Sequence, residues 1–134
     1  MNKEFIPYEQ ALELKALGFN EPCFCFFNPK YSINDLLFGN IDGEFDNWNI
    51  QKDLISAPLY QQAFRWFREK YEITYSIDGA KDYVTVSIDA QEYGEYGELD
   101  GAYDTYEEAE LACLKNLIEI VKGKEVAINC HTYN

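Results

Sequence analysis

The sequence SAPLYQQAFRWFREKYEITYSI, residues 56–77, predicts an amphipathic helix that leads directly into a β-strand. Ser56 is a favourable N-cap residue, and Pro58 falls in the first turn, where a missing N–H is tolerated. Apolar side chains then recur every three or four residues and form one stripe, consisting of Tyr60, Ala63, Phe64, Phe67 and Tyr71. The strand is predicted by the alternation of Ile73, Tyr75 and Ile77.

A second helix is predicted over residues 105–122. Thr105 and Glu108 have the spacing of a capping box, and Gly123 is the expected end of the helix. Apolar residues cover most of the circumference, so we expect this helix to lie between the sheet and another helix. They are Ala109, Ala112, Cys113, Leu114, Leu117, Ile118, Ile120 and Val121.

Two further strands are predicted between these helices. Val84, Val86 and Ile88 face one side of a strand that follows the turn signal Asp78-Gly79, and a third strand ends near Tyr103. The order helix–strand–strand–strand–helix over residues 57–122 is shared with double-stranded-RNA-binding domains. The similarity is one of connectivity alone, because the basic surface of those domains is missing.

The first half of the chain is less regular. Residues 7–17 predict a helix that Gly18 ends, with Tyr8, Ala11, Leu12 and Lys15 on one face and Leu14 and Leu17 widening it. A short strand is expected over residues 22–27, and an irregular region over 31–49, with one short turn near 33–38 and a surface loop over 39–49. Phe45 and Trp48 are expected to pin that loop. Residues 126–133 are expected to form a last edge strand or a tail.

These elements together predict an α+β fold in a single domain over residues 1–134. We expect a small antiparallel sheet of three or four strands, packed on one face against a single layer of about three helices.

The net charge of −13 is concentrated in one segment. Residues 72–110 contain twelve acidic residues and one lysine, Lys81, which gives −11, whereas the rest of the chain has twelve acidic and ten basic residues, which gives −2. Nucleic acids and anionic membranes are bound by clustered Lys and Arg, and no such cluster is present in the sequence. We therefore expect neither direct nucleic-acid binding nor membrane binding, and a basic partner protein, divalent cations or solubility alone remain as explanations of the charge.

The N-terminus, MNKEFIPYEQ, has no apolar run typical of a signal peptide, and no stretch is long enough to span a membrane. A cytoplasmic location with reduced cysteines is therefore expected.

Metal and cofactor sites are only weakly indicated. Cys23, Cys25, Cys130 and His131 could assemble a zinc site if the C-terminal tail paired beside the first strand, but buried core thiols are the favoured interpretation. A Cys–His enzyme would need His131 and a cysteine distant in sequence. Residues 89–100 have the length of an EF-hand loop but lack its ligand pattern. We expect no cofactor, and no catalytic residue can be assigned.

The acidic, tyrosine-bearing segment is the candidate binding surface. Its residues, the acidic strip below, are Glu92, Tyr93, Glu95, Tyr96, Glu98, Asp100, Tyr103 and Asp104. Carboxylates interleaved with aromatic side chains can complement a surface rich in Arg and Lys. The alternative is a solvated hairpin whose charge keeps the protein in solution.

Three stretches carry a family resemblance: IPYEQALELKALGFNEPC at residues 6–23, APLYQQAFRWFREKY at 57–71 and TYEEAELACLKNLIEIVKGK at 105–124. They resemble a group of small proteins of unassigned function from bacteriophages, prophages and their gut-bacterial hosts. The resemblance implies a phage or mobile-element setting. Our leading hypothesis is a non-enzymatic interaction protein that binds a basic partner, for example as a decoy for a nucleic-acid-binding host protein. The alternatives are a small hydrolase or metal-dependent enzyme, and a homo-oligomeric structural protein anchored by an exposed Trp48 or Trp66.

Overall fold

The computed structural model of the chain describes residues 2–39, 45–79, 81–99 and 102–132; for residues 2, 95–96 and 124–132 it describes the backbone alone. The chain divides into two compact units, residues 1–63 and 64–134, and each is described by itself. The described residues form three α-helices and two small antiparallel sheets of three strands each, which confirms the predicted α+β class. The strands thus form two sheets, whereas the sequence predicted one. That residues 1–134 form a single domain remains a prediction.

The first unit begins with a short 3₁₀ helix, η1 (Asn2–Glu4), and helix α1 (Tyr8–Ala16). Gly18 ends α1 as predicted: its φ is 95°, its N–H donates to the Lys15 carbonyl at 3.0 Å, and the Phe19 N–H donates to the Leu14 carbonyl at 2.9 Å. This pair of bonds is a Schellman motif, and it turns the buried Phe19 back onto the helix.

The buried face of α1 differs from the predicted one. Gln10, Ala11 and Leu14 are buried, whereas Leu12 is exposed. The core stripe therefore passes through positions 10, 11, 14 and 17. The prediction was therefore right for Ala11, Leu14 and Leu17. It was wrong for Leu12, and it omitted the polar Gln10.

The first sheet has the strand order β2-β1-β3, with β1 (Cys25–Asn28) between β2 (Ser32–Phe38) and β3 (Ile55–Ala57), all antiparallel. The strand predicted over residues 22–27 is therefore confirmed as a central strand. The short turn predicted near residues 33–38 was wrong, because that segment is the strand β2, in which Phe38 pairs with Cys25. Cross-strand pairing here prevails over the poor β-propensity of Asn34 and Asp35.

The predicted start of the central helix was also wrong. Helix α2 spans Tyr60–Tyr71, and Ser56 is a buried residue of β3 that pairs with Phe26 instead of capping a helix. The backbone stays extended beyond β3, where the Ile6 N–H donates to the Pro58 carbonyl at 3.0 Å. A proline disfavours the helical conformation of the residue before it, which is the physical reason for the later start.

Residues 45–54 are held to the sheet by side-chain hydrogen bonds. The indole N–H of Trp48, in the 3₁₀ helix η2 (Trp48–Ile50), donates to the Cys23 carbonyl at 2.8 Å, and its ring lies 4.4 Å from that of Phe26. The ring of Phe45 lies 5.5 Å from Phe24, although Phe45 is 67% exposed. The predicted pinning by Phe45 and Trp48 is confirmed for these residues, whereas residues 40–44 of the same loop lie outside the described ones.

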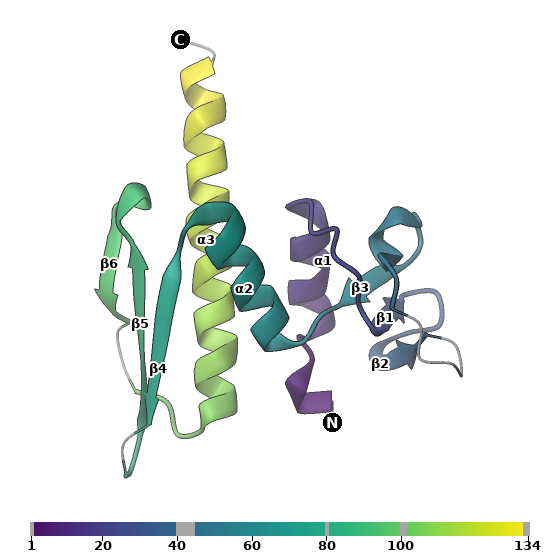
Figure 1. Ribbon diagram of the computed structural model, residues 1–134, viewed down its shortest axis with the longest axis horizontal. Helices are drawn as coiled ribbons and strands as arrows, with labels where there is room; N and C mark the ends of the chain where they lie inside the picture. Colours follow the sequence, from purple (N-terminus) through teal and green to yellow (C-terminus); the bar gives the residue numbers. More distant parts are fainter. Residues whose placement is uncertain (1, 40–44, 80, 100–101, 133–134) are drawn as a thin grey trace. The chain divides into compact units, whose positions relative to one another are not determined.

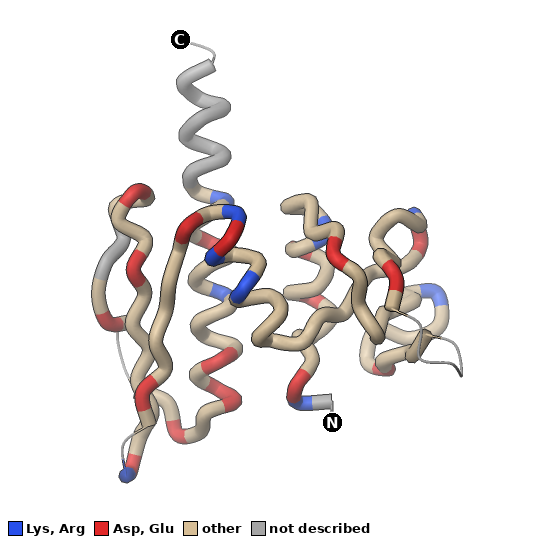
Figure 2. Tube along the Cα trace, in the orientation of Figure 1, with Lys and Arg blue, Asp and Glu red and all other residues tan. Residues whose placement is uncertain are grey.

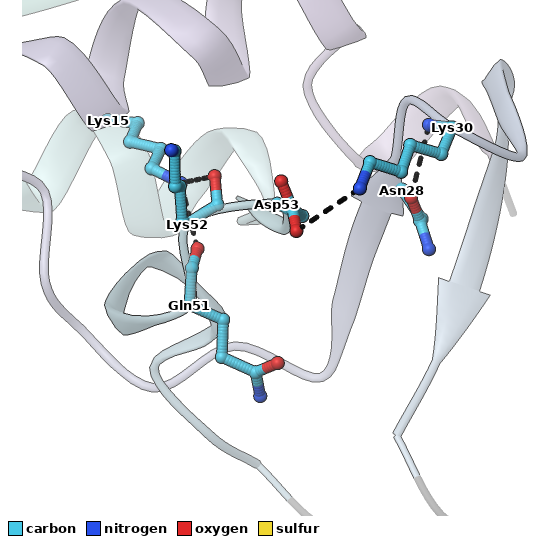
Figure 3. Close-up of polar contacts among 6 residues, drawn as sticks. All are labelled: Lys15, Asn28, Lys30, Gln51, Lys52 and Asp53. Carbon is cyan, nitrogen blue, oxygen red and sulfur yellow. Dashed lines mark hydrogen bonds and ion pairs between the residues drawn. The ribbon is translucent and has the colours of Figure 1, made fainter.

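A lysine joins α1 to the segment before β3 (Figure 3). The Lys15 ammonium donates to three backbone carbonyls, those of Gln51 at 3.0 Å, Lys52 at 3.2 Å and Leu54 at 2.7 Å. Lys30 lies nearby and makes only a 3.5 Å ion pair with the exposed carboxylate of Asp53.

The second unit contains most of α2, the strands β4 (Thr74–Gly79), β5 (Val84–Ala90) and β6 (Glu95–Glu98), and helix α3 (Tyr106–Thr132). The strands form an antiparallel sheet in the order β4-β5-β6, and a short 3₁₀ helix, η3 (Gln91–Tyr93), leads into β6 (Figure 1). The predicted order helix–strand–strand–strand–helix is confirmed.

Helix α3 packs along one face of this sheet (Figure 1). Its buried residues are Ala109, Cys113, Leu114, Leu117, Ile118 and Val121, and the sheet contributes Val84, Val86, Ile88 and Ala90 of β5. Leu111, Ala112 and Ile120 are half-buried. The N-cap half of the predicted capping box is present, because the Glu108 N–H donates to the Thr105 hydroxyl at 3.1 Å. The Glu108 carboxylate accepts from the N–H of Asp104 at 3.2 Å, one residue before the N-cap, and not from that of Thr105.

The predicted end of this helix was wrong, since α3 continues through Gly123 to Thr132. A glycine in a helix interior costs only about 1 kcal/mol relative to alanine, and the following Lys-Glu-Val-Ala favours continued helix. The edge strand expected over residues 126–133 is therefore replaced by helix for 126–132.

Candidate acidic interface

The acidic strip follows the outer edge of the second sheet. Glu92 and Tyr93 lie in η3 at one end of the sheet, Glu95–Glu98 form the edge strand β6, and Tyr103 pairs with Val84 at the other end. The strip thus runs beside the whole of β5, a length of about 20 Å for seven residues. Asp100 lies outside the described residues, and only the backbone positions of Glu95 and Tyr96 are described.

The carboxylates of the strip whose side chains are described are exposed and carry no ion pair. Glu92, Glu98 and Asp104 are all exposed. None of these three carboxylates forms an ion pair with another described residue. These three negative charges are therefore left without a neutralising side chain in the described part of the chain.

The tyrosines of the strip are less available than the sequence suggested. Tyr93 and Tyr103 are half-buried, and Tyr103 exchanges two backbone hydrogen bonds of 2.8 Å with Val84. Tyr103 therefore has a structural role at the end of the sheet, and the exposed side chains described for the strip are the carboxylates Glu92, Glu98 and Asp104.

Sequence reasoning missed part of the acidic surface. The side of the sheet opposite the buried β5 residues, called the open face below, includes Thr74, Ser76, Asp78, Thr85, Ser87, Asp89 and, opposite Ser87 on β6, Glu98, all exposed or half-buried. The register places Asp89 opposite Thr74 and Asp78 opposite Thr85, and the Ser76 hydroxyl donates to the Asp78 carboxylate at 3.0 Å. The alternation of residues 74–89 was the available signal, because it assigns both aspartates to the polar side.

Figure 2 shows how charge is distributed over the second unit. Acidic positions occur along the strands and in the first turns of α3, whereas basic positions lie on α2, on α3 and, between β4 and β5, at Lys81. The sheet edge and the open face thus present mainly negative charge.

A cavity of about 240 Å³ lies between β6 and α3. It is lined by Ile88, Gly97, Glu98, Leu99, Asn116, Glu119 and Ile120. Glu119 of α3 is exposed, whereas the register pairs Glu98 with Ser87 and so places its side chain on the side of the sheet away from α3. The Asn116 amide N–H donates to the Ala112 carbonyl at 2.8 Å, which fixes the side chain on the helix.

The thiols that the structure describes are part of the core. Cys23, Cys25 and Cys113 are free and buried. Burial raises the pKa of Cys23 and Cys113 from 9.0 to about 12 and that of Cys25 to about 11, so these thiols are protonated near neutral pH. Such thiols are poor nucleophiles, which agrees with the interpretation of Cys23 and Cys25 as core residues.

A zinc site from these residues would have needed the C-terminal tail to pair beside the first strand, but residues 126–132 are helical. Cys130 and His131 belong to helix α3 in the second unit, whereas Cys23 and Cys25 belong to the first. Among the described residues, no group of three or more His, Cys, Asp or Glu side chains is arranged to hold a metal ion. The calcium hypothesis also fails on geometry, because Asp89 pairs with Tyr96 in a hairpin instead of opening a cation-binding loop.

The anchors proposed for a homo-oligomer are not freely exposed. Trp66 is 5% exposed, its ring lies 5.1 Å from that of Phe67, and Trp48 is half-buried. Neither indole is therefore a free hydrophobic anchor for a second chain.

Comparison with protein-family models, with curated proteins and with solved structures finds no match to this chain. No helix among the described residues combines the length and the apolar character needed to cross a lipid bilayer.

Proposed function

We propose that this protein is a non-enzymatic interaction protein of phage or mobile-element type that binds a basic partner protein through the second sheet. The observation that carries the proposal is the set of exposed carboxylates at the strip and the open face, including Asp78, Asp89, Glu92 and Glu98, which have no ion pair within the described residues.

Uncompensated charge of one sign attracts a partner of the opposite sign and selects against partners of the same sign. The surface spans about 20 Å along β5, which is long enough to meet several Lys or Arg residues of a partner. Burial keeps the thiols of Cys23, Cys25 and Cys113 protonated, which argues against a nucleophilic role for these three residues.

The test is the binding of the full chain to a synthetic peptide with six arginines separated by Gly-Ser, measured by fluorescence anisotropy between 50 and 300 mM salt. The variant Asp89→Lys/Glu92→Lys reverses two exposed charges of this surface. Exposed ion pairs contribute about 0.2–1 kcal/mol each, so two reversals should weaken binding about tenfold and flatten its salt dependence.

The matched control is Glu4→Lys/Glu9→Lys, which makes the same change of net charge on exposed residues of the first unit. It should change the affinity less than threefold. Binding that is indifferent to salt, or that the control weakens as much as the test variant, would contradict the proposal.

A further inference from the structure

We infer that the basic partner adds an extended segment as an antiparallel strand to the edge strand β6, with basic side chains on the open face and an apolar side chain towards α3. This inference rests on the proposed function, and it names the backbone conformation and the residue pattern that the acidic surface would recognise. It depends on the hydrogen-bonding edge of β6, on the cavity beside Gly97 and on the charge of the open face.

The outer edge of β6 presents backbone groups that β5 does not use. β6 is the last strand in the order β4-β5-β6, and no described strand pairs with its other side (Figure 1). The Leu99 N–H donates to the Val86 carbonyl at 2.8 Å, in the pair that continues the β6 register. Hydrogen-bonded and non-hydrogen-bonded pairs alternate along an antiparallel ladder, so Glu98 and Ser87 form a non-hydrogen-bonded pair. The N–H and C=O of Glu98, and by the same alternation those of Tyr96, therefore point away from β5 and can bind an added strand.

The cavity of about 240 Å³ between β6 and α3 lies on the side of the sheet that an added strand would also cover. Gly97 pairs with the buried Ile88, so the α3-facing side of β6 has no side chain at this position. A Cβ at Gly97 would meet no heavy atom within 4 Å, and Leu99 and Ile120 supply apolar surface beside it. An apolar cavity of about 150 Å³ holds a molecule of the size of benzene, so this space can hold one aliphatic side chain of an added strand.

The other side of the sheet carries negative charge. Glu98 is exposed on the open face opposite Ser87, and the exposed Asp89 lies on the same face of β5. Successive side chains of a strand point to opposite faces. A strand that places an apolar side chain beside Gly97 therefore places its next residue beside Glu98, where Arg or Lys forms a favourable cross-strand pair. The surface thus fits a sequence in which basic and apolar residues alternate.

A second copy of the chain is a poorer occupant of this edge. Pairing of β6 with itself would bring the glutamates of two EYGE segments close together, and like charges opposite one another are destabilising. Charged residues on an edge strand discourage such self-association. A basic strand meets the opposite situation, because Glu98 has no ion pair within the described residues that it would have to give up.

The experiment uses a peptide in which four arginines alternate with three valines, and an isomer in which the same four arginines stand in succession. Binding to the full chain is measured by fluorescence anisotropy at 100 mM salt. Two further versions of the alternating peptide carry N-methyl groups, either on the two inner arginines or on two of the valines. In an antiparallel addition, the residues opposite Tyr96 and Glu98 exchange hydrogen bonds with β6. Methylation of the arginines therefore removes donors to β6, whereas the valine N–H groups point away from it.

We expect the alternating peptide to bind at least fivefold more tightly than its isomer. Methylation of the arginines should weaken binding at least tenfold, and methylation of the valines less than threefold. Amide hydrogen exchange, followed by NMR with saturating peptide, should slow at least tenfold for Glu98, because its N–H gains an acceptor. The Leu99 N–H already donates to the Val86 carbonyl, so its exchange should change less than threefold.

Two kinds of result would overturn the inference in distinguishable ways. If the two isomers bind equally, if valine methylation weakens binding at least as much as arginine methylation, or if exchange at Glu98 is unchanged, no antiparallel strand is added at β6, while the proposed function stands. If neither isomer binds even at 50 mM salt, the proposed function fails together with the inference.

Discussion

Replacing Lys15 by methionine should lower the free energy of unfolding by about 2 kcal/mol, although Lys15 is a charged residue on a helix surface. Its ammonium donates to the carbonyls of Gln51, Lys52 and Leu54 at 3.0, 3.2 and 2.7 Å. These bonds connect α1 to the segment that leads into β3, so one side chain joins two elements far apart in the sequence.

The magnitude follows from the exposure of the three bonds. A hydrogen bond with one charged partner contributes about 1.5–3 kcal/mol, but an exposed carbonyl that loses its donor regains water. The bonds to Gln51 and Lys52 are exposed, and the shortest one, to Leu54, is partly buried. The Leu54 bond should therefore dominate the loss. Methionine keeps most of the aliphatic stem, so packing is largely preserved.

Urea unfolding followed by tryptophan fluorescence measures the effect, because Trp48 packs on Phe26 within the same unit. The matched control is Lys30→Met, which also removes one positive charge. Lys30 and Asp53 have side chains 75% and 57% exposed at 3.5 Å, so their loss should cost less than about 0.5 kcal/mol. Equal destabilisation by the two substitutions would refute the assignment of a structural role to the three carbonyl bonds.

Three further predictions test other local features. Thr105→Ala removes the hydroxyl that caps α3 and should destabilise the fold by about 1 kcal/mol in urea unfolding, whereas Thr105→Ser should be close to wild type; equal losses would speak against the cap. Gly18→Ala places a Cβ at a φ of 95° and should cost about 1 kcal/mol in the same assay, and a neutral result would show that the α1 terminus relaxes freely. The free energy of unfolding should fall as pH rises from about 9 towards 12, because the unfolded Cys113 thiol ionises near 9.0 while burial raises its folded pKa to about 12. Cys113→Ala should make this fall shallower in urea titrations at successive pH values, and an unchanged slope would contradict that contribution.

The features that sequence predicted well are governed by nearby residues. The Thr105 cap of α3 and the Schellman end of α1 at Gly18 depend on contacts within five residues, and both are present. The hairpin strands were also recognisable, because Val84, Val86 and Ile88 alternate with polar residues. Local hydrogen bonding and periodicity suffice for such elements.

The features that were missed depend on distant partners. Strand β2 exists because Phe38 and Leu37 pair with Cys25 and Phe26, and β3 exists because Ser56 pairs with Phe26 across thirty positions. Neither segment alternates clearly enough to show this by itself. The helix α1 face was misassigned for a related reason, since the burial of Gln10 is set by what packs against it.

The residues of the candidate interface also form two groups, those recognisable from the sequence and those brought together only by tertiary structure. The acidic strip was visible as a run of charge in the sequence, and the structure places most of it along one sheet edge. Asp89 and Glu98 meet on the open face only through the strand register, which pairs Asp89 with Thr74 and Glu98 with Ser87. Periodicity within one segment cannot reveal neighbours that tertiary packing brings together.

In the second unit, one face of the sheet packs against α3 and the other is the open face, so substitutions on the two faces have different effects on stability. Side chains such as Val86 and Ile88 are constrained by α3, whereas Ser87 and Asp89 on the same strand contact little that holds the fold together. The polar surface can therefore diverge rapidly, for example to follow a changing partner, while the packed layer beneath it is conserved. Across related chains, we expect sequence variability along β5 to alternate from one residue to the next.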